Sequence, residues 1–259
     1  MPIAAVPNGQ IHYELRGPEN LAVLIFSNSL GTTLEMWDSQ LGDFTKHFRV
    51  LRYDTRGHGR SQVIPGEYTI AGLAEDVVQL LDYLQLPRVF FCGLSMGGAI
   101  GIHLGAHVAQ RFEKLVLCNT AAKFGTPETW NARIQAVQSA GMKAVAGGVI
   151  ERWYTESFRS THTLEVEVTR TMLENANPRG YVSCCAAVRD VDARPYLGDV
   201  SVSSLVLTGT YDPVTPPAEA QFLASQIPAS RYLEVPSAHL SNVEARDEFN
   251  RQVLDFLLH

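Results

Sequence analysis

Gly93-Leu94-Ser95-Met96-Gly97 is the stretch that decides the fold. It lies between the apolar run 89–92 and a helical pattern that begins at Gly98. A strand that turns sharply into a helix needs small residues on both sides of the turn, because the central serine takes up a strained backbone conformation with its hydroxyl exposed. This G-x-S-x-G pentapeptide therefore predicts a nucleophile elbow with Ser95 at its tip.

Two later residues are the partners that a nucleophilic serine needs. A serine hydroxyl is a weak nucleophile at neutral pH, so it requires a base and a carboxylate that orients the base. Asp212 follows the strand-like run 204–209, and His239 follows the strand-like run 231–235. Loops of this kind emerge together at the carboxyl edge of a parallel sheet. We therefore expect Ser95, Asp212 and His239 to converge there as catalytic residues, in the chain order known for this geometry.

Each of the three also has a purely structural interpretation. Ser95 would serve as a helix cap, Asp212 as an Asx-turn residue before a proline, and His239 as a surface loop residue. These interpretations do not explain why all three follow strands in the required order. The catalytic interpretation is therefore favoured.

Apolar runs alternate with helix-length segments along most of the chain. Residues 3–6 and 11–15, joined by the Asn8-Gly9 turn, predict an antiparallel hairpin at one edge of the sheet. Helices are expected at 70–84 and 243–258. The other strand-like runs are 22–26, 50–53, 89–92, 115–118, 205–208 and 232–235. This alternation predicts an α/β fold with a mostly parallel sheet of about eight strands and helices on both faces.

The alternation stops between residues 122 and 196. Strand-like runs disappear there, and helical patterns occupy 130–140, 145–154 and 164–176. An insertion between two strand ends lies above the carboxyl edge of the sheet. We predict that 122–196 is a helical cap over Ser95, while 1–121 and 197–259 form the core. The alternative is a peripheral helical subdomain with no part in substrate binding.

Composition narrows the class of protein. The chain has 259 residues, of which 46% are hydrophobic, enough to bury the core of one domain with an insertion. A net charge of -6 without a dense basic run is atypical of nucleic-acid partners. No apolar segment approaches about 18 residues, which argues against a membrane partner. The four cysteines lack metal-ligand spacing, so reduced thiols and a cytoplasmic location are expected.

Acyl transfer also needs two hydrogen-bond donors aimed at the oxygen that becomes negative. The backbone N–H of Met96, directly after the nucleophile, is expected to be one. The other normally comes from the loop after an early strand, which here is Ser27-Asn28-Ser29-Leu30-Gly31. We assign the Leu30 N–H from its position, although this loop differs from the common His-Gly version.

With these motifs in place, the chain resembles the α/β-hydrolase superfamily, and more narrowly the 3-oxoadipate enol-lactonases of aromatic-compound degradation. The resemblance spans essentially the whole length and is carried by NSLGT (28–32), DTRGHGRS (54–61), FCGLSMGG (91–98), GTYDPVTP (209–216) and AHLSN (238–242). It implies the α/β-hydrolase fold and a serine esterase that opens a five-membered enol lactone carrying a carboxymethyl group. Ester hydrolysis of this kind needs no cofactor and no metal.

The implied substrate is a small anionic lactone, and a pocket shielded from water needs a cation or several donors for its carboxylate. The predicted cap contains suitable side chains. We expect Arg133 to bind the carboxylate, and Trp153 and Trp130 to line the pocket. The other cap arginines considered are expected on the surface; they are Arg159, Arg170 and Arg179.

Two other functions stay open. Other carboxylesterases and the carbon-carbon bond hydrolases of ring-cleavage products share many of these motifs. The second alternative is a ligand sensor on the same fold with a vestigial triad, although the intact triad argues against it. Enzymes that use a carboxylate nucleophile are disfavoured, because position 95 is serine.

Three further histidines are interpreted as structural. His103 and His107 have the spacing of a helical metal pair, but Leu104 stands where a metalloprotease needs a glutamate. His58 lies in a glycine-rich turn after a strand, and we expect it to stabilise that turn rather than to react.

Overall fold

A computed structural model describes residues 2–259, in which one eight-stranded sheet has the order β1-β2-β4-β3-β5-β6-β7-β8. Its strands are β1 (Ile3–Val6), β2 (Gly9–Arg16), β3 (Val23–Ser27), β4 (Arg49–Tyr53), β5 (Val89–Leu94), β6 (Phe112–Cys118), β7 (Ser204–Gly209) and β8 (Ser230–Val235). β1 pairs antiparallel with β2, and β2 with β4, whereas all other neighbours are parallel. The predicted α/β sheet and its edge hairpin are confirmed.

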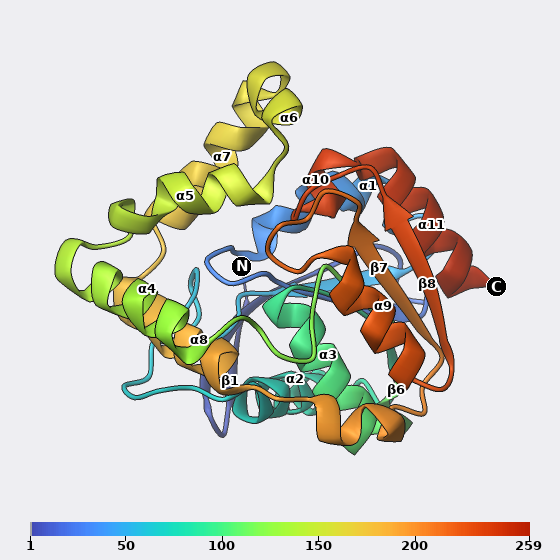
Figure 1. Cartoon of the computed structure of the whole chain (residues 1–259). Helices are drawn as coiled ribbons and strands as arrows, with labels where there is room; N and C mark the ends of the chain where they lie inside the picture. Colours follow the sequence, from blue (N-terminus) through green and yellow to red (C-terminus); the bar gives the residue numbers. More distant parts are fainter. Residues whose placement is uncertain (1) are drawn as a thin grey trace.

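Helices cover both faces of this sheet (Figure 1). α2 packs against α3 on one face, and α1 packs against α11 on the other. The core helices are α1 (Asp38–Phe44), α2 (Ile70–Tyr83), α3 (Met96–His107), α9 (Pro217–Gln226), α10 (Ser241–Glu244) and α11 (Arg246–Leu258), with 3-10 turns η1 (Leu34–Trp37), η2 (Ala109–Arg111) and η3 (Arg194–Asp199).

The sequence explains why α2 begins and packs as it does. The Thr69 side chain accepts a hydrogen bond from the Gly72 N–H, which satisfies one of the free donors of the first turn. Leu73, Val77 and Leu80 recur at helical spacing and are buried against the sheet. The observed helix ends one residue before the predicted limit.

Two predicted helix limits are corrected. α3 begins at Met96 rather than Gly98, directly after the elbow. The single helix predicted over 243–258 is interrupted at Ala245, which leaves helical geometry with φ -111° and ψ 40°. The short α10 turns the Glu244 carboxylate back to the Ala238 N–H, a contact between oxygen and nitrogen of 2.9 Å. This tertiary contact has no counterpart in the local hydrophobic pattern.

The segment between β6 and β7 is a helical insertion above the sheet (Figure 1). Its helices are α4 (Pro127–Ala140), α5 (Lys143–Trp153), α6 (Glu156–Thr161), α7 (Thr163–Glu174) and α8 (Pro178–Asp190). The sequence predicted α4, α5 and α7 but not α6 or α8. A close approach joins α8 to the core, because a Cβ added at Gly180 would lie 1.9 Å from the Gly57 carbonyl oxygen. The limits of this cap at 122 and 196 stay a prediction.

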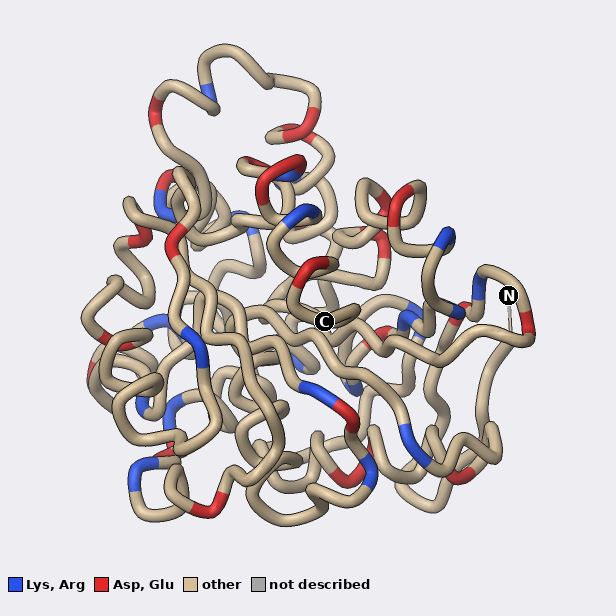
Figure 2. Tube along the Cα trace, turned by 90° about the vertical axis from the view of Figure 1, so that its right-hand side faces the viewer, with Lys and Arg blue, Asp and Glu red and all other residues tan. Residues whose placement is uncertain are grey.

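Three further features concern the described residues as a whole. No helix within residues 2–259 is both long and apolar enough to cross a membrane. All four cysteines are buried and free of disulfide bonds. Acidic and basic residues are interspersed along the trace (Figure 2).

Candidate active site

The turn between β5 and α3 holds Ser95 in a strained conformation. Its φ of 59° and ψ of -114° cost a residue other than glycine of order 1–3 kcal/mol, and the residue keeps 7% exposure. Glycines allow the turn to close. A Cβ at Gly93 would lie 2.2 Å from the Gly97 carbonyl oxygen, and one at Gly97 would lie 2.2 Å from the Ser27 carbonyl oxygen. The small residues are therefore required by contacts between backbones.

His239 and Asp212 are in direct contact at the carboxyl ends of β8 and β7. His239 Nδ1 lies 2.8 Å from Asp212 Oδ2, and both residues are almost fully buried. An ionised carboxylate can only accept hydrogen bonds, so the imidazole proton is on Nδ1. This tautomer leaves Nε2 unprotonated and able to accept a proton.

Asp212 is surrounded by donors that keep it ionised. Its Oδ1 accepts the Val214 and Thr215 N–H groups at 2.7 and 3.1 Å, and its Oδ2 accepts the Thr215 hydroxyl at 2.8 Å. Burial alone would raise the pKa of this carboxyl. The His239 imidazole and the hydrogen bonds outweigh burial and hold the pKa of Asp212 below its usual value. Asp212 therefore forms both the Asx-type turn of the structural interpretation and the contact with His239 that the catalytic interpretation requires.

The end of β6 connects Ser95 to the Asp212–His239 pair. The Ser95 N–H donates to the Cys118 carbonyl at 2.9 Å, and the Thr120 hydroxyl donates to the Ser95 carbonyl at 2.8 Å. Between them, Asn119 donates to Asp212 Oδ2 at 2.9 Å. β6 lies between β5 and β7 in the sheet, so one short segment contacts both sides of the site. Sequence reasoning did not identify Asn119; the only signal was its place at a strand end beside the elbow strand.

The two predicted oxyanion donors lie on adjoining loops. The Gly97 N–H donates to the Asn28 carbonyl at 3.1 Å, which binds the loop after β3 to the first turn of α3. Within the described residues, neither the Leu30 nor the Met96 N–H has a hydrogen-bond acceptor. Both groups are therefore available to an oxygen bound beside Ser95, although their role stays a prediction.

Arg133 lies among aromatic side chains of the cap. Its guanidinium carbon is 4.7 Å from the centre of the Trp130 ring, a cation–π distance. Burial raises the pKa of the Tyr181 hydroxyl, and nearby Arg133 partly opposes that rise. The Tyr181 ring in turn contacts the loop of the predicted donor Leu30, since a Cβ at Gly31 would lie 3.0 Å from it. A chain of contacts thus leads from Arg133 to this loop.

A second arginine, not found from the sequence, accompanies Arg133. Arg152 on α5 is partly buried, and its guanidinium pKa is lowered first by burial and then by Arg133. Among residues 2–259, neither arginine forms an ion pair with a carboxylate. Two neighbouring cations that form no ion pair are suited to binding an anion. No local sequence signal distinguished Arg152, because its proximity to Arg133 arises only when the cap helices pack.

The other predicted cap residues occupy different environments. Trp153 is 5% exposed, and its carbonyl accepts the Leu240 N–H at 3.1 Å, which places the end of α5 beside the His239 loop. Arg179 is exposed, as the sequence predicted. Arg159 instead donates to the Glu151 and Tyr154 carbonyls at the end of α5, and Arg170 lies 3.6 Å from Glu167; both are half-buried.

The histidine pair on α3 is part of an aromatic cluster. The ring centres of His103 and His107 are 4.3 Å apart, and that of His107 is 5.1 Å from the Tyr196 ring. Burial lowers the pKa of His103 to about 4, so it is neutral at physiological pH. No group of three or more His, Cys, Asp or Glu residues in the described chain could hold a metal ion.

Comparison with known proteins places these features in a family. Residues 22–157 match the family described as the alpha/beta hydrolase fold. The 3-oxoadipate enol-lactonase 2 of Acinetobacter baylyi is 42% identical over 243 residues, which cover 94% of this chain and 91% of that protein. The 3-oxoadipate enol-lactonase 1 of the same organism is 36% identical over 236 residues, 91% of this chain and 88% of its own length.

A solved structure agrees with these sequence relationships. The crystal structure of the enol-lactonase from Burkholderia xenovorans matches with a TM-score of 0.98 and 42% identity, and the match covers 100% of both chains. Similarity to proteins of this name therefore extends over the core and the helical insertion alike.

Proposed function

This chain belongs to the alpha/beta hydrolase family, and from that premise we propose that it is an enol-lactonase that opens 3-oxoadipate enol-lactone to 3-oxoadipate. The proposal is supported by a strained serine that one strand end joins to an aspartate–histidine pair, and by two neighbouring cap arginines that form no ion pair within residues 2–259. The first part of this arrangement suits acyl transfer, and the second suits an anionic ester. The expected cytoplasmic location belongs to the same proposal.

The first half-reaction forms an acyl-enzyme. Ser95 Oγ attacks the lactone carbonyl carbon while His239 Nε2 takes the hydroxyl proton. The carbonyl oxygen becomes negative and accepts hydrogen bonds from the Leu30 and Met96 N–H groups. The ring carbon–oxygen bond then breaks, and the enol oxygen leaves with the proton that His239 returns. Asp212 stays ionised throughout and stabilises the imidazolium.

The second half-reaction releases the product. His239 Nε2 takes a proton from water, the resulting hydroxide attacks the acyl carbon, and the bond to Ser95 Oγ breaks as the serine regains its proton. Ketonisation of the released enol gives 3-oxoadipate and makes ring opening effectively irreversible.

The two arginines explain how the cap would recognise this substrate. The carboxymethyl group remains charged at neutral pH, and a carboxylate that leaves water needs charged partners. Arg133 can form a bidentate contact with it while stacked on Trp130, and Arg152 adds a second positive charge. Trp153 would close the pocket beside the His239 loop.

A comparison of two substrates tests the proposal. We expect the purified chain to hydrolyse the enol lactone prepared from muconolactone at least about 100-fold more efficiently, as kcat/KM, than p-nitrophenyl acetate, because only the lactone carries a carboxylate for the arginines. Poor lactone turnover beside good aryl-ester turnover would contradict the lactonase assignment.

A serine variant separates an enzyme from a ligand sensor. The Ser95→Ala variant should lose nearly all turnover and still bind 3-oxoadipate, because the arginines are untouched. A variant with unchanged turnover would refute the serine mechanism.

A further inference from the structure

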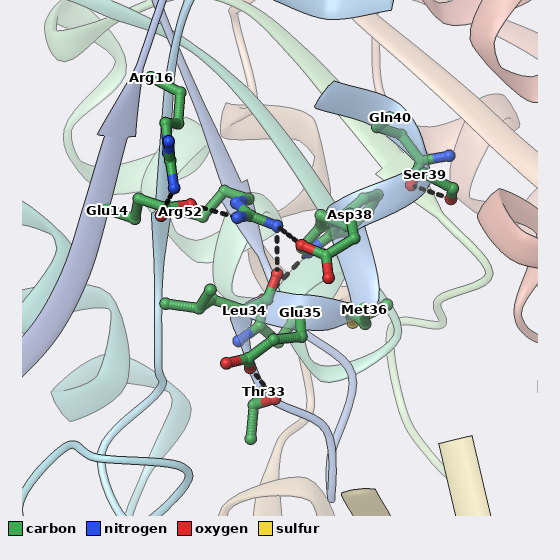
Figure 3. Close-up of polar contacts among 12 residues, drawn as sticks. Glu14, Arg16, Thr33, Leu34, Glu35, Met36, Asp38, Ser39, Gln40 and Arg52 are labelled. Atoms are coloured by element: carbon green, nitrogen blue, oxygen red, sulfur yellow. Dashed lines mark hydrogen bonds and ion pairs between the residues drawn. The ribbon is translucent and has the colours of Figure 1, made fainter. Parts of the chain in front are cut away.

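Side chains from β4 and the turn after it hold the segment that follows the predicted oxyanion donor Leu30. The Gly31 N–H donates to His58 Nε2 at 2.9 Å, and the Leu34 N–H donates to Asp54 Oδ1 at 2.9 Å. Arg52 Nη1 donates to the Leu34 carbonyl at 3.1 Å, between the carboxylates of Glu14 and Asp38 (Figure 3). Both ends of segment 31–34 are therefore fixed by side chains.

The contact at Gly31 bears most directly on the donor. Leu30 lies between two anchors, because the Asn28 carbonyl is held by the Gly97 N–H at 3.1 Å and the Gly31 N–H is held by His58. Gly31 has a φ of 85°, a left-handed conformation that glycine reaches without strain. With its N–H turned toward His58, the chain reverses immediately after Leu30. The direction of the Leu30 N–H then depends on both anchors and on the Ser29 carbonyl of the same peptide, which accepts the Thr32 N–H at 3.2 Å and the Thr32 hydroxyl at 2.8 Å.

His58 can fill this role only in one chemical form. It is 1% exposed, and burial lowers its pKa to about 4, so the imidazole is neutral at physiological pH. Its Nε2 accepts from Gly31, which assigns the proton to Nδ1. Nδ1 faces the Arg56 carbonyl at 3.5 Å and the Cys184 sulfur at 3.8 Å. A protonated imidazole could not accept the Gly31 N–H.

We propose that His58 is a positioning residue for the oxyanion hole: its Nε2 holds the Gly31 N–H and thereby keeps the Leu30 N–H aimed at the carbonyl oxygen of the bound ester. The inference rests on the proposed serine-hydrolase function but not on the identity of the lactone. His58 contacts the reacting atoms only through this loop. It should therefore affect the transition state more than the binding of substrate.

Substituting His58 by two amide side chains of different length tests the proposal. Glutamine can place an acceptor oxygen near the position of His58 Nε2, whereas asparagine reaches only the Nδ1 side. With p-nitrophenyl acetate as substrate, we expect His58→Asn to lower kcat about 10- to 100-fold with KM within about twofold, since misaligning one oxyanion donor costs part of the hundredfold or greater loss caused by removing one. His58→Gln should recover kcat to within about fivefold of the wild type.

A tetrahedral inhibitor separates this role from a general loss of structure. The inhibition constant of phenylboronic acid, which forms an anionic adduct with the serine, should rise in His58→Asn by about the same factor as kcat falls. The dissociation constant of 3-oxoadipate should not change. Cys184→Ala, which removes the sulfur contacts with His58 Nδ1 and the Arg56 carbonyl but leaves the Nε2 contact, is the matched control and should keep wild-type kcat. Wild-type kcat and boronate affinity in His58→Asn would overturn the proposal.

The wild-type protein offers a test that does not depend on the folding of a variant. The ¹⁵N chemical shifts of the His58 ring should identify a neutral Nδ1–H tautomer throughout pH 5–9, and an Nε2–H tautomer would overturn the proposal. Because the kinetic test uses an aryl ester, failure of the lactone assay would leave it intact. Loss of all activity in the wild type, by contrast, would refute the proposed function instead.

Discussion

Asn119 Nδ2 donates to Asp212 Oδ2 at 2.9 Å, from the end of the strand that separates the serine strand from the aspartate strand. The same amide donates to the Ala238 carbonyl at 3.2 Å, directly before His239. Its oxygen accepts the Ser241 hydroxyl at 2.6 Å. One buried amide therefore contacts the carboxylate and both sides of the histidine loop.

Removing this amide should weaken catalysis and stability together. Asn119→Ala leaves a buried carboxylate with one donor fewer, and a lost hydrogen bond to a charged group costs about 1.5–3 kcal/mol of unfolding free energy. A mispositioned His239 should lower kcat by about tenfold, which corresponds to ~1.4 kcal/mol. Urea unfolding and steady-state kinetics would measure the two effects. Ser241→Ala, which removes a contact only with the amide oxygen, is the control and should have the smaller effect on kcat.

Acid should remove the stability that Asp212 contributes. The pKa of Asp212 is lowered in the folded protein, so its contribution is present above the unfolded pKa, near 3.8, and is lost as the pH falls through the folded value. The difference in unfolding free energy between wild type and Asp212→Asn should therefore shrink as the pH falls below about 4. Urea unfolding at each pH measures this difference.

The control for that series is an aspartate that is partly exposed on the surface. The pKa of Asp192 is lowered to about 2, chiefly by hydrogen bonds from Arg194. Solvent screens this surface pair, so Asp192→Asn should change stability little at any pH. A pH-independent difference for Asp212→Asn would show that the carboxylate does not gain stability from its partners.

The extent to which sequence predicts this molecule differs between the sheet and the site. Asn8-Gly9 between alternating runs predicted the edge hairpin, because this dipeptide favours the turn that matches strand twist. The apolar spacing over 70–84 likewise predicted α2. These features depend on residues close together in the chain, so local chemistry is enough to find them.

The missed features depend on contacts between distant segments. The break at Ala245 accompanies the contact of Glu244 with the Ala238 N–H and the Thr155 backbone of the cap. Asn119 and Arg152 acquire their environments only when strands and cap helices assemble. A local pattern identifies an asparagine or an arginine but not the groups that the fold places around it.

Charge recognition by the cap should be visible as a difference between substrates. Arg133→Gln should raise KM for the enol lactone about 10- to 100-fold, because a charge-assisted contact with a carboxylate contributes about 1.5–3 kcal/mol. Arg152→Gln should have a smaller effect of the same sign. Neither variant should change kcat/KM for p-nitrophenyl acetate, which has no carboxylate. Arg179→Gln, at an exposed position of the cap, should match the wild type with both substrates. Equal losses on both substrates would contradict a role in charge recognition.

The loop after β3 lies so close to the elbow that position 97 should tolerate no side chain. A Cβ there would lie 2.2 Å from the Ser27 carbonyl oxygen and 3.0 Å from that of Asn28, both backbone atoms that cannot rotate away. Gly97→Ala should therefore displace the Leu30 donor and lower kcat at least about 100-fold, comparable to removing a donor from the oxyanion hole.

Gly147→Ala on α5 is the matched control, because no atom lies within 4 Å of its added Cβ. That variant should gain about 0.5–1 kcal/mol of unfolding free energy from helix propensity and keep wild-type kcat. Steady-state kinetics and thermal unfolding of both variants would measure these effects, and an active Gly97→Ala would show that the loop has room the contacts do not indicate.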